Sequence, residues 1–330
     1  MVPVDVQNVL KKQHYFLVGE HSAVQICRWT KKSIRDEGGC YKEKFYGIKS
    51  HQCCQMSPAA VFCPNKCLHC WRAIEYTLGD KINGKINSPS EIIDGCINAQ
   101  RKLLQGFNID KKSRKKQLSK ANMKKYLEAL EPMHFAISLS GEPTIYPLIG
   151  DLIQELRQRG KTSFLVTNGL YPEKIKEIAR KKQLPTQLYV SVNAPNEEIY
   201  KKIHRSSIKD AWNKLNETLE FLPSLKEKTR TIFRMNLIKD LNMDESYTKE
   251  YAELIGKANP LFVEIKGYMS VGFARKRLGY ERMPSYKEML EFVKKLATAT
   301  GLKVLDSHEF SRAWVLGKEK KRLKIEREEI

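Results

Sequence analysis

The sequence lacks the segments that would place a protein in or across a membrane. No run of apolar residues is long enough to span a bilayer. The first residues, Met1-Val2-Pro3-Val4-Asp5, lack the charged and apolar regions of a signal peptide. We therefore expect a cytoplasmic protein that has no membrane partner.

Cysteine is almost absent from most of the chain, since seven of the eight cysteines lie between Cys27 and Cys70. A disulfide framework is rare in the cytoplasm. Structural cysteines would be scattered through the core, whereas clustered cysteines favour metal binding. The eighth, Cys96, falls on the apolar stripe of a predicted helix, and we interpret it as a core residue.

Acidic residues are few relative to basic ones. The chain has 38 Asp and Glu against 59 Lys and Arg, which gives a formal net charge of +21. Such an excess repels itself in a compact protein and favours a polyanionic partner, with nucleic acid as the first choice. The alternative is a thermophile-like surface, but that pattern usually enriches Glu alongside Lys. Two strongly basic segments, 111–125 and 318–327, either contact nucleic acid or form solvated tails.

The rest of the chain, 330 residues in all, alternates between short apolar runs and helical patterns. The clearest helix spans 88–105, where Ser88 and Glu91 form a capping box around Pro89. Repeated βα units predict an α/β fold with a parallel sheet, either open or curled into a barrel. We expect strands at 58–62, 134–139, 164–167, 188–193, 231–238 and 261–266, and further helices at 148–160, 172–182, 208–222, 247–255 and 285–300.

A compact cysteine loop, Cys63-Pro64-Asn65-Lys66-Cys67-Leu68-His69-Cys70, directly follows the first predicted strand. Three thiolates need a fourth ligand to enclose tetrahedral zinc, but they suit three irons of a 4Fe-4S cube and leave the fourth iron open. His69 is the zinc alternative's only nearby fourth ligand, and it is squeezed between two cysteines. The spacing favours an iron–sulfur cluster.

A second cysteine set precedes the loop. Twelve residues separate Cys27 from Cys40, and twelve more separate Cys40 from Cys53. From the residues alone, these thiolates either ligate a second metal, with Cys54 or His51 assisting, or are three unrelated cysteines.

Polar residues also follow three of the predicted strands. Each group alone is an ordinary turn at a strand end. Their repetition, one group per strand end, favours a shared cofactor site at the carboxyl edge of the sheet. The groups are Ser140-Gly141-Glu142-Pro143, Thr167-Asn168-Gly169 and Ser191-Val192-Asn193.

The Cys-x3-Cys-x2-Cys loop resembles the defining motif of the radical SAM superfamily, in which SAM is S-adenosylmethionine. The resemblance implies a partial (β/α)6 barrel of the TIM-like type with its site at the carboxyl ends of the strands. It also implies that the open iron chelates SAM and that an electron from the cluster releases a 5′-deoxyadenosyl radical. His69 would lie against the adenine. Ser140, Gly141, Glu142 and Pro143 resemble the family's "GGEP" element, with Ser for the first Gly, and would contact the methionyl amino group. Thr167, Asn168, Ser191 and Asn193 would read the ribose and carboxylate.

The two cysteine sets together resemble one radical SAM family more closely, the 4-demethylwyosine synthases of the wybutosine pathway. Trp71-Arg72, the Ser-Gly-Glu-Pro-Thr run and Tyr268-Met269-Ser270 extend the resemblance along the chain. It implies a second 4Fe-4S cluster on Cys27, Cys40 and Cys53. It implies condensation of N1-methylguanosine, beside the anticodon of phenylalanine tRNA, with two carbons of pyruvate. Lys42 corresponds to a lysine proposed to form a Schiff base with pyruvate, while a competing proposal has the second cluster chelate it.

We expect three parts in the chain: an extension carrying the second cluster at 1–56, the radical SAM barrel at 57–306, and a basic tail at 307–330. There is no room for the flavodoxin-like domain of eukaryotic members, so we expect a separate electron donor such as a ferredoxin or flavodoxin. The alternatives are another RNA-modifying radical SAM enzyme, either a methylthiotransferase or a base methylase, and a non-catalytic zinc-bearing RNA-binding protein.

Overall fold

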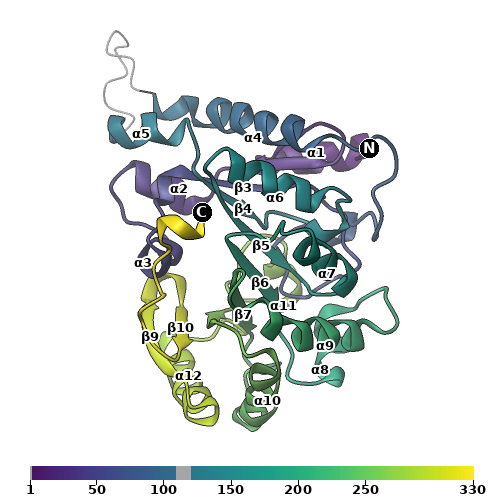
Figure 1. Cartoon of the computed structure of the whole chain (residues 1–330), viewed down its shortest axis with the longest axis vertical. Helices are drawn as coiled ribbons and strands as arrows, with labels where there is room; N and C mark the ends of the chain where they lie inside the picture. Colours follow the sequence, from purple (N-terminus) through teal and green to yellow (C-terminus); the bar gives the residue numbers. More distant parts are fainter. Residues whose placement is uncertain (1, 109–119) are drawn as a thin grey trace.

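One sheet of ten strands runs through the chain in the computed structural model, which describes residues 2–108 and 120–330 (Figure 1). Six consecutive strands, β3 to β8, pair in parallel in chain order. An antiparallel pair extends each end, β1 and β2 beside β3, and β10 and β9 beside β8. The strands are β1 (Phe16–Val18), β2 (Ser22–Gln25), β3 (Cys53–Ser57), β4 (His134–Ile137), β5 (Thr162–Thr167), β6 (Gln187–Ser191), β7 (Arg230–Leu237), β8 (Phe262–Gly267), β9 (Lys303–His308) and β10 (Ala313–Gly317). The six parallel strands confirm the predicted partial (β/α)6 barrel.

Helices cover the outer side of this curved sheet, with α4, α6, α7, α9 and α10 following one another along it (Figure 1). Their apolar stripes and the outward side chains of the strands form the main core. The helices are α1 (Val4–Lys12), α2 (Arg28–Ile34), α3 (Tyr41–Tyr46), α4 (Pro89–Leu104), α5 (Met123–Ala129), α6 (Ile149–Gln158), α7 (Pro172–Arg180), α8 (Glu197–His204), α9 (Ala211–Phe221), α10 (Thr248–Ala258), α11 (Ala274–Leu278) and α12 (Tyr286–Thr300). This packing leaves the inner side of the sheet for the site.

The capping signals in the sequence mark helix α4 correctly. Ser88 accepts a hydrogen bond from the Glu91 backbone, and the Glu91 carboxylate accepts one from the Ser88 backbone. Cys96 is fully buried in the main core, which confirms its interpretation as a core residue.

The first predicted strand, 58–62, is wrong. The strand is β3, five residues earlier, where Cys53–Ser57 pairs with β4. Val61 has a φ of +64°, a left-handed conformation that a strand cannot contain. Its apolar neighbours Ala59, Ala60 and Phe62 instead pack in a separate cluster that includes side chains of helix α1. The cysteine loop therefore follows a buried turn.

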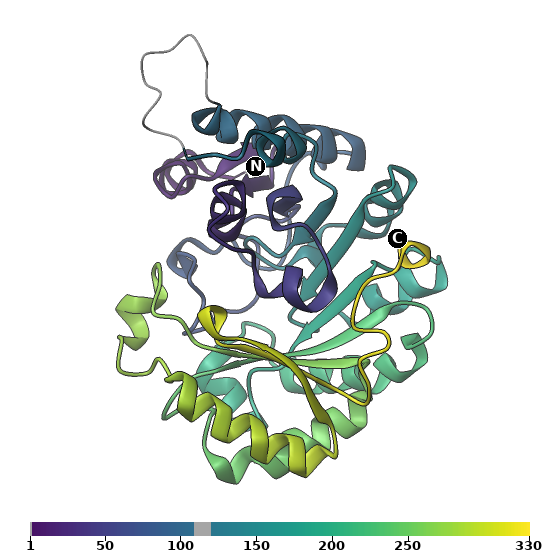
Figure 2. The same cartoon turned by 90° about the vertical axis from the view of Figure 1, so that its left-hand side faces the viewer.

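The sheet crosses both expected boundaries between the three parts of the chain. β1, β2 and β3 lie before residue 57, and β10 lies after residue 306. Figure 2 shows β9 and β10 at the end of the sheet beside α12. The three expected parts thus share one sheet, and their separate functions stay predictions.

The two basic segments differ. Most of the segment 111–125 lies outside the described residues, and its last three residues open helix α5. The C-terminal segment is no solvated tail, because Leu323 is buried and its carbonyl accepts a hydrogen bond from Arg230 at 2.9 Å. Arg230 also pairs with Glu329 at 2.9 Å. Since Arg230 begins β7, this segment closes the end of the barrel opposite the carboxyl edge.

Strand alternation sorts the side chains of the barrel interior into layers. Phe164, Tyr189, Ile232 and Phe262 form an apolar cluster inside the sheet, together with side chains of α3. Two residues further along their strands, toward the carboxyl edge, stand Ser191, Arg234 and Glu264, which are register partners on β6, β7 and β8. The interior therefore has an aromatic floor beneath a polar layer.

Candidate active site at the carboxyl edge of the barrel

The cysteine loop is held by backbone hydrogen bonds to the end of helix α8. The Lys66 and Leu68 amides donate to the carbonyls of His204 and Ile203, each at 2.9 Å, and Ser207 donates to the Pro64 carbonyl at 2.9 Å. Pairing of this kind fixes the loop's path without using its side chains. The cysteine side chains therefore stay available for ligation.

Arg277, at the other side of the loop, clamps it from helix α11. Its guanidinium donates to the carbonyls of Leu68 at 3.1 Å, of Arg72 at 3.2 Å, and of Cys70. Charge-assisted hydrogen bonds are stronger than neutral ones. A loop that carries three cysteines is thus anchored by one arginine from a distant part of the chain.

The three loop thiols lie together and are partly buried. Cys67 interacts electrostatically with Cys63 and Cys70, and its Sγ lies 3.2 Å from Nδ1 of His204. Burial raises the pKa of all three thiols above its ordinary value. Metal must displace these protons to bind, so metal binding here depends on pH.

The donor set suits a cluster better than one ion. Within the residues that the structure describes, no group of three Cys, His, Asp or Glu side chains converges on a position for a single metal. In a 4Fe-4S cube each thiolate binds a different iron, so the thiolates need no common centre. This arrangement disfavours the zinc alternative, in which four ligands converge on one ion.

Unpaired buried polar atoms surround the loop. Buried polar groups are nearly always hydrogen-bonded, so such a concentration points to a ligand that completes them. Among the described residues that lack a partner, those near the loop are Nδ1 of His69, Nδ2 of Asn168, both amide atoms of Asn65, Nε2 of His204, and the hydroxyls of Tyr171 and Tyr200. The residues present fit a bound cluster and a polar cofactor.

The Ser140–Pro143 turn after β4 is built against the segment that precedes the cysteine loop. Gly141 has a φ of +74°, and a Cβ there would lie 1.9 Å from the Ala59 carbonyl oxygen. Only glycine therefore fits. The Glu142 amide donates to the Phe62 carbonyl at 2.7 Å, while the Ser140 hydroxyl accepts from Val61 at 3.4 Å.

Glu142 links the ends of two strands. Its carboxylate accepts hydrogen bonds from the Thr167 hydroxyl at 2.6 Å, from the backbone amide of Asn168 at 2.7 Å and from the Thr144 hydroxyl at 2.6 Å. Burial raises the pKa of this carboxyl, although these donors oppose the shift. Pro143 follows it as the start of a short 3-10 turn. Glu142 is thus a buried acceptor at the edge of the site.

The remaining predicted SAM residues meet at the same edge. The side-chain Nδ2 of Asn193 lies 3.3 Å from Nε2 of His69, and this contact joins the end of β6 to the cysteine loop. Burial lowers the pKa of His69 to about 4, with Arg277 and Arg234 adding to the shift, so its imidazole is neutral at pH 7. Asn168 interacts with the Cys63 thiol, and Ser191 ends β6 on its inner face.

The fold also brings the N-terminal cysteines together. Cys27 and Cys40 occupy the positions just before α2 and α3, and Cys53 begins β3. Burial raises the pKa of Cys40 and Cys53; interaction with Cys27 raises both further, and interaction with Cys40 also raises that of Cys53. These three cysteines, far apart in sequence, form one group.

The two assisting ligands considered for this set lie elsewhere. Cys54 faces the outer core, because strand alternation turns it away from Cys53, and it interacts there with Cys96. His51 is engaged by Glu128 at 2.7 Å. The set therefore has three cysteine ligands to offer.

Lys42 lies between the N-terminal cysteines and the barrel interior. Its residue is 8% exposed, and its ammonium stands over the rings of Phe164 and Tyr189 at 4.7 and 4.6 Å. Burial is the largest cause that lowers the pKa of Lys42, and nearby Arg234 lowers it further, while Glu264 opposes them. A buried lysine with a lowered pKa is suited to act as a nucleophile.

Four residues of this region were not predicted from the sequence. His204 contacts Cys67 and stacks on Tyr200, with ring centroids 4.4 Å apart. Arg277 clamps the loop, and Arg234 and Glu264 form a buried ion pair at 3.4 Å. Neither His204 nor Arg277 belongs to one of the motifs found in the sequence. For Arg234 and Glu264 the sequence offered one signal, which is that each is a charged residue inside a predicted apolar strand. A charged residue at such a position indicates a functional interior.

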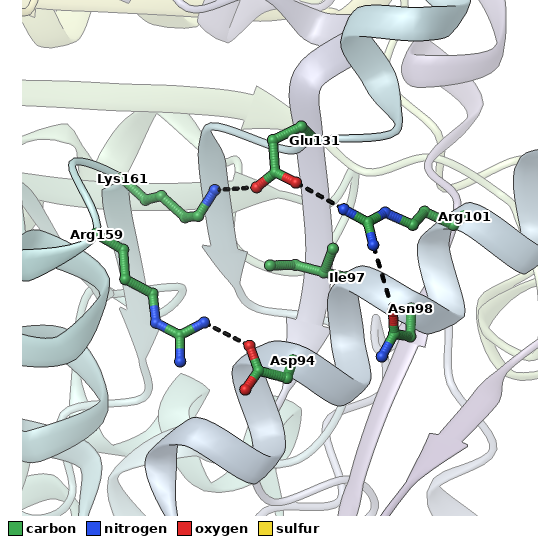
Figure 3. Close-up of a pocket in the computed structure, with 7 residues that line it drawn as sticks. All are labelled: Asp94, Ile97, Asn98, Arg101, Glu131, Arg159 and Lys161. Atoms are coloured by element: carbon green, nitrogen blue, oxygen red, sulfur yellow. Dashed lines mark hydrogen bonds and ion pairs between the residues drawn. The ribbon is translucent and has the colours of Figure 1, made fainter.

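A surface hollow of about 430 Å³ lies between α4 and α6 and has no residue of either cysteine set in its lining (Figure 3). Its charges pair with one another, with Arg159 on Asp94 at 2.5 Å and Lys161 and Arg101 on Glu131 at 2.7 and 2.8 Å. These pairs tie the outer helices to the segment before β4. The hollow has a structural explanation.

Among the described helices, none combines the length and apolar character needed to cross a bilayer.

Two family models match the chain side by side. The Radical SAM superfamily matches residues 58–252, and a family described as Wyosine base formation matches residues 257–318. The second match covers β8, α11, α12, β9 and β10, and therefore includes Arg277, Glu264 and Lys266.

Named relatives extend over the whole chain. A Pyrococcus abyssi protein named S-adenosyl-L-methionine-dependent tRNA 4-demethylwyosine synthase is 44% identical and covers 94% of this chain and 88% of its own. The Methanocaldococcus jannaschii protein of the same name is 35% identical over 98% and 99% of the two chains. The mouse relative is 37% identical, and the match spans 42% of its length.

Two solved structures share the fold throughout. One, described as TYW1 with a lysine–pyruvate adduct bound, has a TM-score of 0.84 at 34% identity and covers 99% of each chain. The other, archaeal TYW1, has a TM-score of 0.77 at 31% identity and covers 98% of this chain and 100% of its own. With the cysteine loop, the partial barrel and these full-length relatives, this chain belongs to the radical SAM family of tRNA 4-demethylwyosine synthases.

Proposed function

We propose that this enzyme condenses N1-methylguanosine in phenylalanine tRNA with pyruvate to form the tricyclic base, as the names of its relatives indicate. The observation that carries the proposal is the position of Lys42. This buried lysine lies beside the N-terminal cysteines and above the aromatic floor of the barrel whose carboxyl edge carries the loop cysteines. One interior therefore faces both cysteine sets.

The loop residues hold the SAM site. Cys63, Cys67 and Cys70 would ligate a 4Fe-4S cluster, which supplies the electron that splits SAM into methionine and a 5′-deoxyadenosyl radical. Neutral His69 would lie against the adenine and offer its unpaired Nδ1 as a hydrogen-bonding atom. The roles assigned to Ser140, Gly141, Glu142, Pro143, Thr167, Asn168, Ser191 and Asn193 are contacts to the methionyl, ribose and carboxylate groups.

The N-terminal set would hold a second 4Fe-4S cluster through Cys27, Cys40 and Cys53. Both Cys27 and Cys40 precede a helix, where backbone amides favour negative charge. The support is that Cys53, at the start of β3, interacts electrostatically with both Cys27 and Cys40, which come from two other elements. These cysteines lie next to Lys42, the residue proposed to bind pyruvate, so we place pyruvate on this side of the barrel.

Lys42 would hold pyruvate as a Schiff base. The neutral amine attacks the keto carbon, the carbonyl oxygen leaves as water, and a C=N bond replaces C=O. Burial lowers the pKa of Lys42, which raises the fraction of neutral amine available for this step. A relative of the same fold has been solved with a lysine–pyruvate adduct, which favours covalent capture over chelation.

The formal charge of +21 fits an RNA substrate that is a polyanion. A separate reductant, such as a ferredoxin or flavodoxin, would supply the electrons. We propose a cytoplasmic location, where tRNA and these donors are found.

Anaerobic assay tests the function. The iron-loaded enzyme, incubated with reductant, SAM, pyruvate and tRNA that carries N1-methylguanosine, should give the tricyclic nucleoside by mass analysis. Cyanoborohydride with labelled pyruvate should mark Lys42, and Lys42→Arg should abolish both the mark and the product while SAM cleavage continues. Product formation by Lys42→Arg at the wild-type rate would contradict the role of Lys42.

A further inference from the structure

The barrel interior between the two cysteine sets holds more positive than negative charge. Lys42 enters from α3, Arg234 from β7 and Lys266 from β8, and the strand residues share the inner face with Glu264. Glu264 is the one carboxylate among the main electrostatic influences on both lysines. Three cations thus surround a single buried acid.

Glu264 is already engaged by other groups. Its Oε2 accepts a hydrogen bond from the Tyr46 hydroxyl at 3.1 Å, and its Oε1 lies 3.4 Å from Nε of Arg234. Glu264 is fully buried, so no water shares its charge. Its Oε1 has no hydrogen-bond partner among the described residues, but one carboxylate carries a single negative charge and cannot balance Arg234 and two lysines together.

The two lysines have aromatic neighbours in place of carboxylates. Across the described part of the chain, no carboxylate lies within 4 Å of the Lys42 or Lys266 ammonium. The Lys266 ammonium stands 4.4 Å from the centre of the Tyr41 ring, as Lys42 stands over its own pair of rings. A ring face attracts a cation but does not neutralise it. Buried charges are normally paired. Among the described residues, the cysteines of the N-terminal set are the other groups that favour the charged form of these lysines, and neither lysine has a carboxylate of its own.

Lys266 is placed for a ligand that also reaches Lys42. Its leading electrostatic partners are Arg234, Glu264, Lys42 and Cys40, the last of which belongs to the N-terminal cysteines. Its residue is half-buried, and the Arg234 side chain keeps 24% of its surface accessible. A small anion that enters the barrel can therefore contact Lys266 and Arg234 together.

An α-ketoacid has the required shape, because its carboxylate is bonded directly to its keto carbon. A group that binds the carboxylate must stand next to the amine that attacks the keto carbon. We propose that Lys266, with Arg234, binds the carboxylate of the α-ketoacid whose keto carbon reacts with Lys42. This subsite rests on the proposed function, since it takes pyruvate as the ketoacid.

The methionyl end of SAM carries a carboxylate too, and Arg234 influences His69 on the cysteine loop as well as Lys42. Both ligands therefore need to be measured. A change at Lys266 should separate pyruvate from SAM, because none of the cysteines that would hold the SAM cluster is among the leading electrostatic partners of Lys266.

The test variant is Lys266→Gln in the full-length, iron-loaded protein. Labelled pyruvate is trapped on Lys42 with cyanoborohydride over a range of pyruvate concentrations, without SAM or tRNA, and the labelled peptide is quantified. The half-saturating concentration should rise at least tenfold, which corresponds to about 1.4 kcal/mol, with the same maximum labelling. Lys266→Arg should restore most of the affinity. Lys44→Gln is the matched control, because Lys44 lies on the same helix as Lys42 but is exposed and pairs with Asp306 at 3.0 Å.

Methyl pyruvate separates carboxylate binding from a general loss of Lys42 reactivity. It has the keto carbon without the negative charge, so Lys266→Gln and wild type should trap it equally. The SAM dissociation constant should also be the same in both. An unchanged pyruvate dependence in Lys266→Gln, an equal loss with methyl pyruvate, or a loss confined to SAM would each overturn the subsite.

The outcome is independent of the tricyclic product. If wild type traps no pyruvate, equilibrium dialysis with the labelled acid makes the same comparison, and absence of binding to wild type overturns the subsite. A wild-type protein that binds pyruvate through Lys266 but forms no tricyclic nucleoside would refute the proposed function and leave the subsite standing.

Discussion

The two cysteine sets are assembled in opposite ways. The loop set lies within residues 63–70, and its backbone is fixed by the end of α8 and by Arg277. The N-terminal set comes from the starts of α2, α3 and β3, which the sheet and its helices bring together. Burial raises the pKa of the thiols in both sets. A local loop and a tertiary assembly thus produce similar chemical environments, and variants can separate them.

The largest effect is expected from removal of the loop set. Replacing Cys63, Cys67 and Cys70 together with Ala should abolish SAM cleavage, because the cluster that is lost is the one beside the proposed SAM residues at the carboxyl edge of the sheet. About half of the iron should remain, since the N-terminal set keeps its own cluster. Iron analysis and 5′-deoxyadenosine measurement check both points. Retention of all the iron would show that the N-terminal cysteines hold no separate cluster.

Removal of the N-terminal set should abolish product formation but leave SAM cleavage intact. We expect the Cys27, Cys40 and Cys53 triple Ala variant to cleave SAM but to yield no tricyclic base, because the cluster beside Lys42 and its bound pyruvate is lost. Chromatography for 5′-deoxyadenosine and nucleoside mass analysis give the two readouts. A variant that makes the product at the wild-type rate would refute the second-cluster role.

A more moderate effect is expected when the clamp on the loop set is removed. Arg277→Gln removes charge-assisted hydrogen bonds to loop carbonyls and should lower the free energy of unfolding by about 2 to 3 kcal/mol. The loop cluster should also be lost faster on dilution than the N-terminal one. Denaturant titration and cluster spectroscopy measure these changes. Lys276→Gln, on the same helix but exposed, is the control and should change neither.

A smaller effect is expected at the corresponding support of the N-terminal set. The Cys40 amide donates to the Ser50 hydroxyl at 2.9 Å, so Ser50→Ala should destabilise the protein by about 1 kcal/mol. In the loop-triple background, the remaining cluster should be lost somewhat faster. The exposed Ser90→Ala serves as control. If Arg277→Gln and Ser50→Ala accelerated the loss of both clusters equally, the two sets would not be independently supported.

Much of the fold could be predicted because its signals are local. Capping boxes define α4 and α12, and continuous apolar runs define the parallel strands β4 to β8. The antiparallel strands β1, β2, β9 and β10 were missed because they lie at the two ends of the sheet, outside the repeated βα units, and are ordered by pairing with their neighbours. The first parallel strand was misplaced because the apolar run 58–62 fills a buried turn.

The sequence by itself determined the cysteine loop and its chemistry, because ligands within eight residues need only their spacing to be recognised. It also determined the alternation that builds the barrel, since hydrophobic periodicity is a property of each segment alone. The tertiary structure decided what shares the interior. Lys42, Arg234, Glu264 and Lys266 come from three separate elements, and only the curvature and register of the sheet bring their charges into one buried space, where low polarity makes each interaction strong.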